Sequence, residues 1–282
     1  MHESPRTIGL LFHPKKPESI ALTERMEGFL RDRGRAVWVG SAWDEPDALA
    51  HVAGLDVLVT LGGDGTMLRA ARVGSRHRVP ILGIKLGRVS FLAEVTPEVW
   101  REPLEQMLAG NYWLEERMML DVGVDRGGEP PVNHSYLALN DVVISRGGLA
   151  RLVSIQAWVD QGYLTTYRAD GVIVSTPTGC TGYALAAGGP ILPPELKNIL
   201  LIPICPHLSL DRPVVLAQGA TVTLQAHADY APILTVDGQF EIALAEGDRV
   251  EVRASQHVSH FVHMQDRTYF YRTLMERLRW AI

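Results

Sequence analysis

The sequence predicts an α/β N-terminal domain built on a parallel, Rossmann-like sheet and an all-β, sandwich-like C-terminal domain, with a C-terminal helix returning to the first domain. Over the first 110 residues, short apolar runs alternate with helical patterns, as in βαβ units. From about residue 112 to 265, many short alternating segments are separated by Asp-Gly, Gly-Gly and Pro. The end of the chain is helical again. We therefore expect domains at 1–111 and 112–264 and a C-terminal helix at 265–282.

Strands and helices are expected to alternate in the N-terminal domain. Apolar, β-branched runs predict strands at 7–12, 36–39, 55–61 and 81–84. Helices are predicted at 17–33 and 66–76. A further helix is expected over 96–110, with Thr96 as its N-cap, Pro97 in its first turn and Gly110 after its last.

In the C-terminal domain, Asp170-Gly171 and Asp237-Gly238 each lie between two strand patterns and predict hairpin turns, and Asp237 is expected to be only a turn residue. A short helix of small residues is predicted from Thr181. In the tail, Phe270, Leu274 and Leu278 share one helical face, so we expect this helix to pack on the α/β domain.

The composition is that of an ordinary soluble globular protein, with 46% hydrophobic and 21% charged residues. A net charge of −5 and no basic run longer than Lys15-Lys16 argue against a nucleic-acid partner. The longest apolar stretch, 199–205, is too short to span a membrane. Two cysteines provide no disulfide framework or metal spacing, and no secretion signal is recognised, so a cytoplasmic location is expected.

The stretch VLVTLGGDGTMLRAAR, residues 57–72, contains an Asp-Gly pair that a strand enters and a helix leaves. Glycines at this turn can adopt positive φ and bring backbone N–H groups close to a phosphate, beside the positive end of a helix. The expected phosphate cradle is Gly62, Gly63, Gly65 and Thr66. An aspartate in such a cradle needs a task, such as meeting a metal ion or accepting a proton from a hydroxyl. The alternative is a plain turn with Asp64 as a helix cap.

Two further features could serve a ligand. In STPTGCTGYALAAGGPIL, residues 175–192, small residues would let a large flat molecule approach the backbone, although a tightly packed interdomain helix would have the same composition. In ALNDVVISRG, Asn140 and Asp141 interrupt an apolar strand and could bind the two hydroxyls of a ribose, or could form an Asx turn.

The three histidines at 257, 260 and 263 do not predict a zinc site. On a strand His260 faces away from the other two, and we expect no suitably placed carboxylate.

Together, GGDGT, LNDVV and TPTGCTGYALAAGGPI, in this order, resemble the bacterial NAD kinases, whose patterns are GGDGT, an Asn-Glu/Asp pair, and TPTGSTAY followed by small residues and GGPI. The resemblance covers most of the chain and includes GIKLGRVSFLAE, ICPHLSLDRPVVL and DGQ at 237–239. Lipid kinases share GGDGT, and phosphofructokinases carry a close variant. The TPTG segment is the feature that discriminates between them.

The resemblance implies transfer of the γ-phosphoryl group of ATP, with a divalent metal such as Mg²⁺, to the 2′-hydroxyl of the adenosine ribose of NAD. It also implies an NAD site between the domains that a neighbouring subunit completes, and hence a homodimer or homotetramer. Polyphosphate remains open as a donor. A lipid or sugar kinase and a non-catalytic NAD(P)-binding sensor are the alternatives.

By motif position, the resemblance makes Asp64 the catalytic base and assigns NAD contacts to fifteen residues. These are Asp64, Gly65, Arg69, Asn140, Asp141, Arg151, Arg168, Asp170, Thr181, Gly182, Tyr183, Ala184, Leu185, Ala186 and Gln239, with Phe91 and Leu92 as further candidates. No protein side chain is assigned to a metal.

Five positions depart from the family pattern. Lys85 stands where the family has Asn, Ser90 where it has Gly, and Cys180 and Gly182 where it has Ser and Ala. Ala186 replaces a serine and removes a hydroxyl that could bind NAD.

Overall fold

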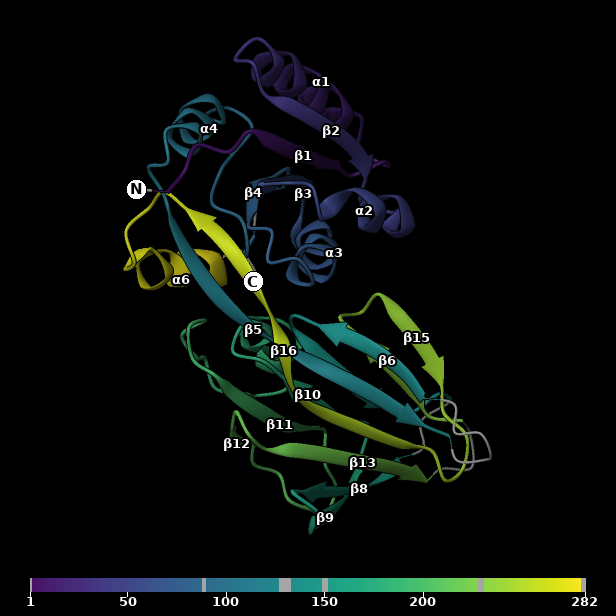
Figure 1. The fold of residues 1–282 in the computed structure, drawn as a ribbon. Helices are drawn as coiled ribbons and strands as arrows, with labels where there is room; N and C mark the ends of the chain where they lie inside the picture. The colour runs from purple at the N-terminus through teal and green to yellow at the C-terminus, as the bar shows by residue number, and fades with distance from the viewer. Residues whose placement is uncertain (1, 88–89, 127–132, 149–151, 228–230, 280–282) are drawn as a thin grey trace. The chain divides into compact units, whose positions relative to one another are not determined.

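The computed structural model describes residues 2–87, 90–126, 133–148, 152–227 and 231–279 (Figure 1). The chain forms two compact units, residues 1–117 with 257–282 and residues 118–256. Two long strands, β5 (Trp113–Asp125) and β16 (Arg249–His263), contribute to both units. The expected boundaries at 111 and 264 assign both strands wholly to the second domain, whereas their contacts divide each strand between the units.

The first unit contains a parallel sheet in the order β2-β1-β3-β4. Its strands are β1 (Thr7–Phe12), β2 (Ala36–Ser41), β3 (Val57–Gly62) and β4 (Ile81–Lys85), which confirms the four predicted strands. The end of β16 lies beside β4, where Phe261 pairs with Ile81. All of β3 is buried, as expected for a central parallel strand covered on both faces.

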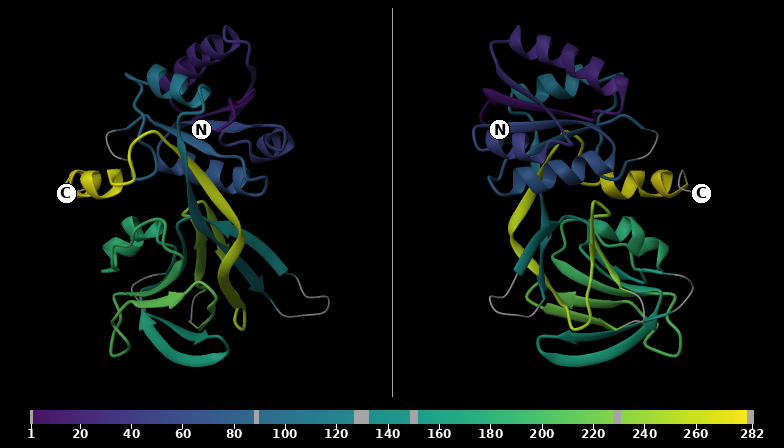
Figure 2. Two further views of the ribbon diagram at one scale, coloured as in Figure 1. Left: turned by 60° about the vertical axis from the view of Figure 1, so that its left-hand side comes forward. Right: turned by 90° about the vertical axis from the view of Figure 1, so that its right-hand side faces the viewer.

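Helices cover both faces of this sheet, α1 and α4 on one side and α2 and α3 on the other (Figure 2). They are α1 (Pro17–Arg31), α2 (Glu45–Val52), α3 (Asp64–Ser75) and α4 (Arg101–Leu108). The structure adds α2, which was not predicted and which Asp44 caps by accepting a hydrogen bond from the Asp47 N–H at 3.2 Å. Helix α4 begins at Arg101, later than expected, and the residues between it and Thr96 form a turn in which the N–H of Val99 donates to the carbonyl oxygen of Thr96 at 3.3 Å.

The C-terminal helix α6 (Tyr269–Arg279) belongs to the first unit, as predicted. Its Arg277 guanidinium donates a hydrogen bond from Nη1 to the carbonyl oxygen of Phe91 at 3.1 Å. This contact joins the end of the chain to the loop that follows β4.

The second unit is an antiparallel β-sandwich. In one sheet β6-β5-β16-β13-β8-β9 are neighbours, and in the other the order is β12-β11-β10-β7-β14-β15. The remaining bounds are β6 (Asn133–Ala138), β7 (Asp141–Ser145), β8 (Val153–Val159), β9 (Gly162–Ala169), β10 (Gly171–Ser175), β11 (Asn198–Ile204), β12 (Val214–Ala217), β13 (Thr221–His227), β14 (Ile233–Val236) and β15 (Phe240–Ala243). Alternating side chains of both sheets, such as Val142 and Leu224, form one apolar core between them.

One of the two predicted hairpins is present. Asp237 and Gly238, at φ +51° and +60°, connect the paired strands β14 and β15. The prediction at Asp170-Gly171 was wrong, because β9 and β10 lie in different sheets and the dipeptide forms the corner between them. A Cβ atom on Gly171 would lie 2.5 Å from the carbonyl oxygen of Ile144, so close packing requires glycine there.

Neither cysteine forms a disulfide; Cys180 is buried, and Cys205 is exposed. In the described part of the chain, no helix has both the length and the apolar character needed to cross a membrane.

Candidate functional site

The glycine-rich turn lies at the carboxyl end of β3. Strand β3 ends at Gly62, and helix α3 begins at Asp64, so the positive end of the helix dipole is located at this turn. Gly63 is half-buried and Gly65 is exposed, and a Cβ atom on either would meet nothing within 4 Å, so there is room for a ligand beside them. This arrangement suits phosphate oxygens.

Gly62 is required for a reason that the sequence did not reveal. The expectation of positive φ at Gly62 and Gly63 was wrong, because neither adopts it. Instead, a Cβ atom on Gly62 would lie 2.0 Å from Oγ1 of Thr66. Thr66 is buried, and its hydroxyl has no hydrogen-bond partner. The first glycine therefore makes room for the first turn of the helix, and the second leaves the surface open.

Loops from neighbouring strands meet this turn. The backbone N–H of His13, after β1, donates to the carbonyl oxygen of Leu61 at 3.1 Å, and that of Leu86, after β4, donates to Gly62 at 2.8 Å. The ammonium group of Lys16 donates to the carbonyl oxygen of Leu86 at 3.3 Å. In parallel α/β sheets, ligands usually bind beside the carboxyl ends of the strands. Lys16 lies at this edge of the sheet.

Asp64 is held at both carboxylate oxygens. The hydroxyl of Ser90 donates to Oδ1, and the backbone N–H of Phe91 donates to Oδ2 at 3.1 Å. Phe91, a further candidate, thus contacts Asp64 through its backbone, whereas the side chain of Leu92 is buried. Asp64 is therefore oriented by the loop after β4 and is not a simple helix cap.

Arg69 lies on α3 one turn beyond Gly65. Its guanidinium carbon is 4.6 Å from the centroid of the Trp43 ring. Burial and the neighbouring Arg72 lower the Arg69 pKa, and Glu45 opposes this shift. A partly desolvated cation on the helix that begins at this turn can attract an anionic ligand.

In the second unit, Asn140 and Asp141 are positioned by Asp237. Oδ1 of Asp237 accepts the N–H groups of Asn140 at 2.8 Å and Asp141 at 3.1 Å, and Oδ2 accepts that of Leu139 at 2.9 Å. One buried carboxylate thus fixes three successive residues. The interpretation of Asp237 as only a turn residue missed this role, because the contact joins segments almost 100 residues apart.

Asp141 is 8% exposed. Burial, together with the charge of Asp237, raises its pKa to about 7. Burial disfavours the ionised form of this carboxyl because it removes solvating water. Hydrogen bonds donated by a bound ligand would replace that water and stabilise the ionised form.

The segment after β10 packs against Asn140. The hydroxyl of Ser175 donates to the carbonyl oxygen of Asn140 at 3.1 Å, and the N–H of Thr176 donates to the same atom at 2.9 Å. A Cβ atom on Gly179 would lie 2.2 Å from that oxygen, so glycine is required. The side-chain Oδ1 of Asn140 and the hydroxyl of Thr178 are buried without hydrogen-bond partners. Such orphaned polar atoms are compatible with a polar ligand.

A short helix, α5 (Tyr183–Ala186), follows Gly182. Gly182, Tyr183 and Ala186 are exposed, Thr181 and Leu185 are half-buried, and all lie just beyond Gly179. Ala184 is the exception, because its side chain is fully buried in a core cluster that includes Cys180. We therefore correct the expectation for Ala184: only its backbone can reach a ligand.

Other expected NAD-binding residues are more dispersed. Gln239 follows Asp237 in the hairpin and so lies near Asn140. Asp170 lies at the opposite end of the β7–β10 pair, beside Arg168 near the end of β9. Its neighbour Arg146 is six residues from Asn140, which is about 20 Å along an extended strand. Asp170 pairs with Arg146, Nε to Oδ1, at 3.3 Å. Arg151 lies outside the described residues.

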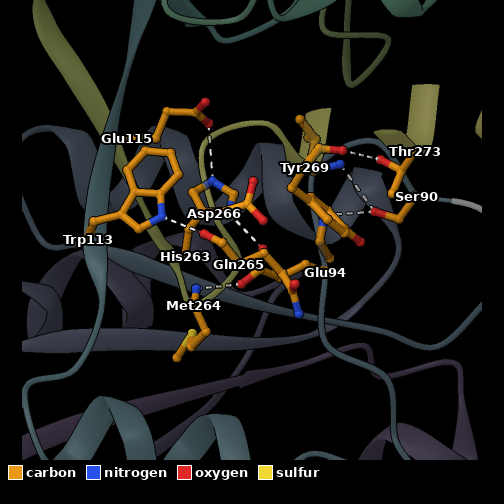
Figure 3. Close-up of polar contacts among 12 residues, drawn as sticks. Ser90, Glu94, Trp113, Glu115, His263, Met264, Gln265, Asp266, Tyr269 and Thr273 are labelled. Atoms are coloured by element: carbon orange, nitrogen blue, oxygen red, sulfur yellow. Dashed lines mark hydrogen bonds and ion pairs between the residues drawn. The ribbon is translucent and has the colours of Figure 1, made fainter. Parts of the chain in front are cut away.

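A buried ionic cluster surrounds His263 in the first unit (Figure 3). Nδ1 of His263 is 3.0 Å from Oε2 of Glu94, and Nε2 is 3.1 Å from Oε2 of Glu115. Glu115 also accepts a hydrogen bond from Nε of Arg117 at 2.6 Å. Burial disfavours the charged ring, but the hydrogen bonds to Glu115 and Glu94 outweigh it and raise the His263 pKa.

The prediction that no carboxylate lies near the three histidines was therefore wrong for His263. Folding brings Glu94 and Glu115 to it from distant parts of the sequence. Over the described ranges, no group of three or more His, Cys, Asp or Glu residues is arranged to hold a metal ion.

Comparisons with known proteins agree with these features. The family models for the N-terminal and C-terminal domains of ATP-NAD kinase match residues 46–112 and 139–264. The NAD kinase of Chloroflexus aurantiacus is 42% identical over 272 residues, covering 96% of this chain and 98% of that protein. That of Citrifermentans bemidjiense is 40% identical over 290 residues, covering 98% and 99%.

Two solved structures share the whole fold. A crystal structure of yeast NADH kinase complexed with NADH has a TM-score of 0.82 and 25% identity, covering 98% of this chain and 88% of that one. An NAD kinase from Archaeoglobus fulgidus in complex with ATP has a TM-score of 0.76 and 26% identity, covering 97% and 98%. With both domain models matched and relatives of about 40% identity over nearly its full length, the chain belongs to the NAD kinase family, whose members are enzymes that phosphorylate NAD.

Proposed function

We propose that the chain transfers the γ-phosphoryl group of ATP to the 2′-hydroxyl of the adenosine ribose of NAD, with Asp64 as the base. The hydroxyl oxygen forms a bond to the γ-phosphorus, the bond to the β–γ bridging oxygen breaks, and ADP leaves. The hydroxyl proton passes to Asp64. The observation that carries this proposal is a carboxylate fixed at both oxygens beside open glycines. A carboxylate is a weak base for an alcohol, so it acts late and mainly by orienting the hydroxyl.

The donor phosphates are assigned to the turn at Gly63 and Gly65. Lys16 and Lys85, at the ends of neighbouring loops and strands, would balance their charge. The A. fulgidus relative, described in complex with ATP, supports ATP as the donor. Mg²⁺ commonly binds through one or two carboxylates and substrate phosphates, which fits a site with the single carboxylate of Asp64. When bound, Mg²⁺ would neutralise charge on the transferred group.

The acceptor NAD is assigned to residues of the second unit. The unpartnered Oδ1 of Asn140 and the buried carboxyl of Asp141 would bind ribose hydroxyls. The exposed small residues Gly182 and Ala186 would let the rings of NAD approach the backbone. The yeast relative, described in complex with NADH, supports a dinucleotide acceptor.

Asp170 and Arg168 are too far along the strands from Asn140 to serve easily the same NAD molecule. We assign them to the site of a neighbouring subunit, in a homodimer or homotetramer. Mixing inactive Asp64→Asn with inactive Asp170→Ala subunits would then restore about a quarter of wild-type activity, because half of randomly mixed dimers contain one intact site. No recovery after confirmed subunit exchange would contradict this assignment.

A cytoplasmic location completes the proposal. It is supported by the two cysteines, neither of which forms a disulfide although Cys205 is exposed.

Replacing the base tests the assigned mechanism. Asp64→Asn removes the proton acceptor but keeps the size of the side chain, so we expect turnover to fall at least ~100-fold while NAD affinity changes less than ~3-fold. NADP formation from NAD, ATP and magnesium measures the first quantity, and calorimetric titration with NAD measures the second.

Asp47→Asn is the matched control, because it makes the same change at an exposed carboxylate on α2. Wild-type turnover in Asp64→Asn would overturn the role of Asp64. Absence of NADP with every donor and with either NAD or NADH, despite NAD binding, would instead favour a non-catalytic sensor.

A further inference from the structure

Ser90 occupies a position where the family resemblance leads us to expect glycine, and its hydroxyl contacts the proposed base. Ser90 is 2% exposed, so its hydroxyl depends on protein partners. Its Oγ atom accepts the backbone N–H of Leu92 at 3.2 Å and that of Ala93 at 2.9 Å. Backbone N–H groups can only donate, so both contacts use lone pairs of the hydroxyl oxygen.

The direction of the third contact follows from this count. A serine hydroxyl has two lone pairs and one hydrogen. With both lone pairs engaged by the loop, the hydrogen points at Oδ1 of Asp64. An ionised carboxylate only accepts, so this is a charge-assisted hydrogen bond of fixed direction.

The other oxygen of Asp64 is held separately. The N–H of Phe91 donates to Oδ2 at 3.1 Å, a backbone contact that does not use the Ser90 side chain. A glycine at 90 would keep this single anchor and leave Oδ1 free to rotate about it. The hydroxyl of Ser90 therefore determines the orientation of the carboxylate plane.

We propose that Ser90 is a positioning residue, which orients the carboxylate of Asp64 toward the acceptor hydroxyl through the O–H···Oδ1 hydrogen bond. The inference rests on the proposed function only for the identity of that acceptor. It assigns Ser90 no contact with substrate. Because alignment of the base matters in the transition state more than in substrate binding, the effect belongs to kcat rather than KM.

Three substitutions at position 90 test this role. Ser90→Ala and Ser90→Gly remove the hydroxyl, and Ser90→Gly installs the residue that the family pattern carries. We expect both to lower kcat about 10-fold while KM for NAD and for ATP changes less than 2-fold, a loss typical of one charge-assisted hydrogen bond. Ser90→Thr retains a hydroxyl and is expected to recover at least half of the wild-type kcat.

The control separates this effect from a general loss of stability. Ser75→Ala removes another buried serine hydroxyl of the same unit, at the far end of α3, where it donates to the carbonyl oxygen of Arg72. We expect its kcat to be unchanged. In the Asp64→Asn background, Ser90→Ala is expected to cost less than 2-fold, because the partner carboxylate is already gone.

A readout that does not depend on activity keeps this inference distinct from the proposed function. At pH 8 the carboxyl ¹³C resonance of Asp64, identified by its loss in Asp64→Asn, is expected to move in Ser90→Ala and Ser90→Gly and to stay near its wild-type position in Ser90→Thr. If the resonance moves but the wild type makes no NADP, the proposed function fails while the contact stands. An unmoved resonance, or an equal loss of kcat in Ser90→Ala with and without Asp64, would overturn the positioning role.

Discussion

At the scale of single residues, carboxylates perform three different tasks in this chain. Asp64 is half-buried at the glycine-rich turn, Asp237 binds backbone N–H groups, and Asp141 is buried with a raised pKa. The same chemical group is therefore a candidate base, a brace for backbone N–H groups, and a candidate ligand-binding group, according to its surroundings.

The brace can be tested by Asp237→Asn. An amide nitrogen cannot accept the backbone N–H that one carboxylate oxygen now accepts, so the Asn140–Asp141 segment should lose its fixed geometry. We expect KM for NAD to rise about 10-fold and KM for ATP to stay constant, as measured by steady-state kinetics. Asp160→Asn is the control, since Asp160 is an exposed turn residue that accepts the N–H of Thr221 at 2.8 Å. An unchanged KM for NAD would limit Asp237 to a structural role.

The buried carboxyl of Asp141 is expected to lower the stability of the folded protein as pH rises, while contributing to NAD binding. Its folded pKa of about 7 lies above its ordinary 3.8, so the folded state binds the proton more tightly and stability falls as pH rises from about 4 to 7. Asp141→Asn removes this loss. We expect its free energy of unfolding, relative to the wild type, to be on the order of 2 kcal/mol more favourable at pH 8 than at pH 5.

Urea titrations at the two pH values measure this difference. NAD binding by Asp141→Asn should be at least ~10-fold weaker, because the ligand loses an ionised acceptor. Equal relative stability at pH 5 and pH 8 would contradict the buried charge as its cause.

The sequence predicted the residues that carry recognisable local patterns. Asp64, Asn140 and the TPTG segment were singled out because each lies within a few residues of its own structural context, and their roles stay predictions. Asp237 was underestimated and Glu115 overlooked, because their partners come from segments about 100 residues or more away. The sequence also did not show why glycine is needed at position 62, because the close approach of the Thr66 side chain is a property of the folded turn.

At the scale of elements, the two adjacent glycines in the turn between β3 and α3 are needed for different physical reasons. Gly62→Ala would force the new methyl against the first turn of α3, whereas Gly63→Ala would place its methyl in open space. We expect Gly62→Ala to cost about 1–3 kcal/mol of unfolding free energy. We expect Gly63→Ala to cost less than ~1 kcal/mol but to raise KM for ATP at least ~10-fold, because the methyl occupies the phosphate surface.

Thermal unfolding and donor kinetics separate these outcomes, and each variant is the control for the other. A normal KM for ATP in Gly63→Ala would remove the donor phosphates from this turn. Equal stability of the two variants would contradict the steric account of Gly62.

Helices and strands were predicted correctly where the pattern of apolar residues was strong. The prediction failed where the pattern was weak, or where the structure depends on pairing between strands that are distant in the sequence. The four parallel strands are compact apolar runs, and all were predicted. Helix α2 was missed because only two of its eight residues, Ala48 and Val52, are buried, which leaves a weak periodic signal. At Asp170-Gly171 the dipeptide favours a hairpin, but the partners of β9 and β10 are different strands from elsewhere in the chain.

At the scale of the whole molecule, the ionic cluster around His263 makes the free energy of unfolding depend on pH. The His263 pKa lies above 6.5, so its contribution is fully present below pH 6.5 and is lost as pH rises through the folded value. At the acid end, burial raises the pKa of Glu115, but Arg117 and His263 outweigh it and lower it to about 2. The contribution of Glu115 is therefore present above about pH 4.5 and is lost as pH falls toward 2.

His263→Gln tests the upper limit of this window. Glutamine cannot carry the charge that both glutamates face, so we expect it to cost about 1–3 kcal/mol of unfolding free energy at pH 6 and less at pH 9. Chemical unfolding of the apo protein at the two values measures the difference. His227→Gln is the control, because that histidine pairs with a single exposed glutamate. A cost independent of pH would show that packing, not charge, explains the loss.

The first unit is interrupted by the second along the chain, since residues 118–256 separate its two parts. During synthesis at ~5–20 residues per second, the ribosome adds that stretch in roughly 7–28 s. Throughout this interval β4 lacks the end of β16 beside it, and the carbonyl of Phe91 lacks its contact with Arg277. The nascent chain therefore contains the GGDGT turn early but completes its support last, so an incomplete chain carries the proposed base without its final scaffold.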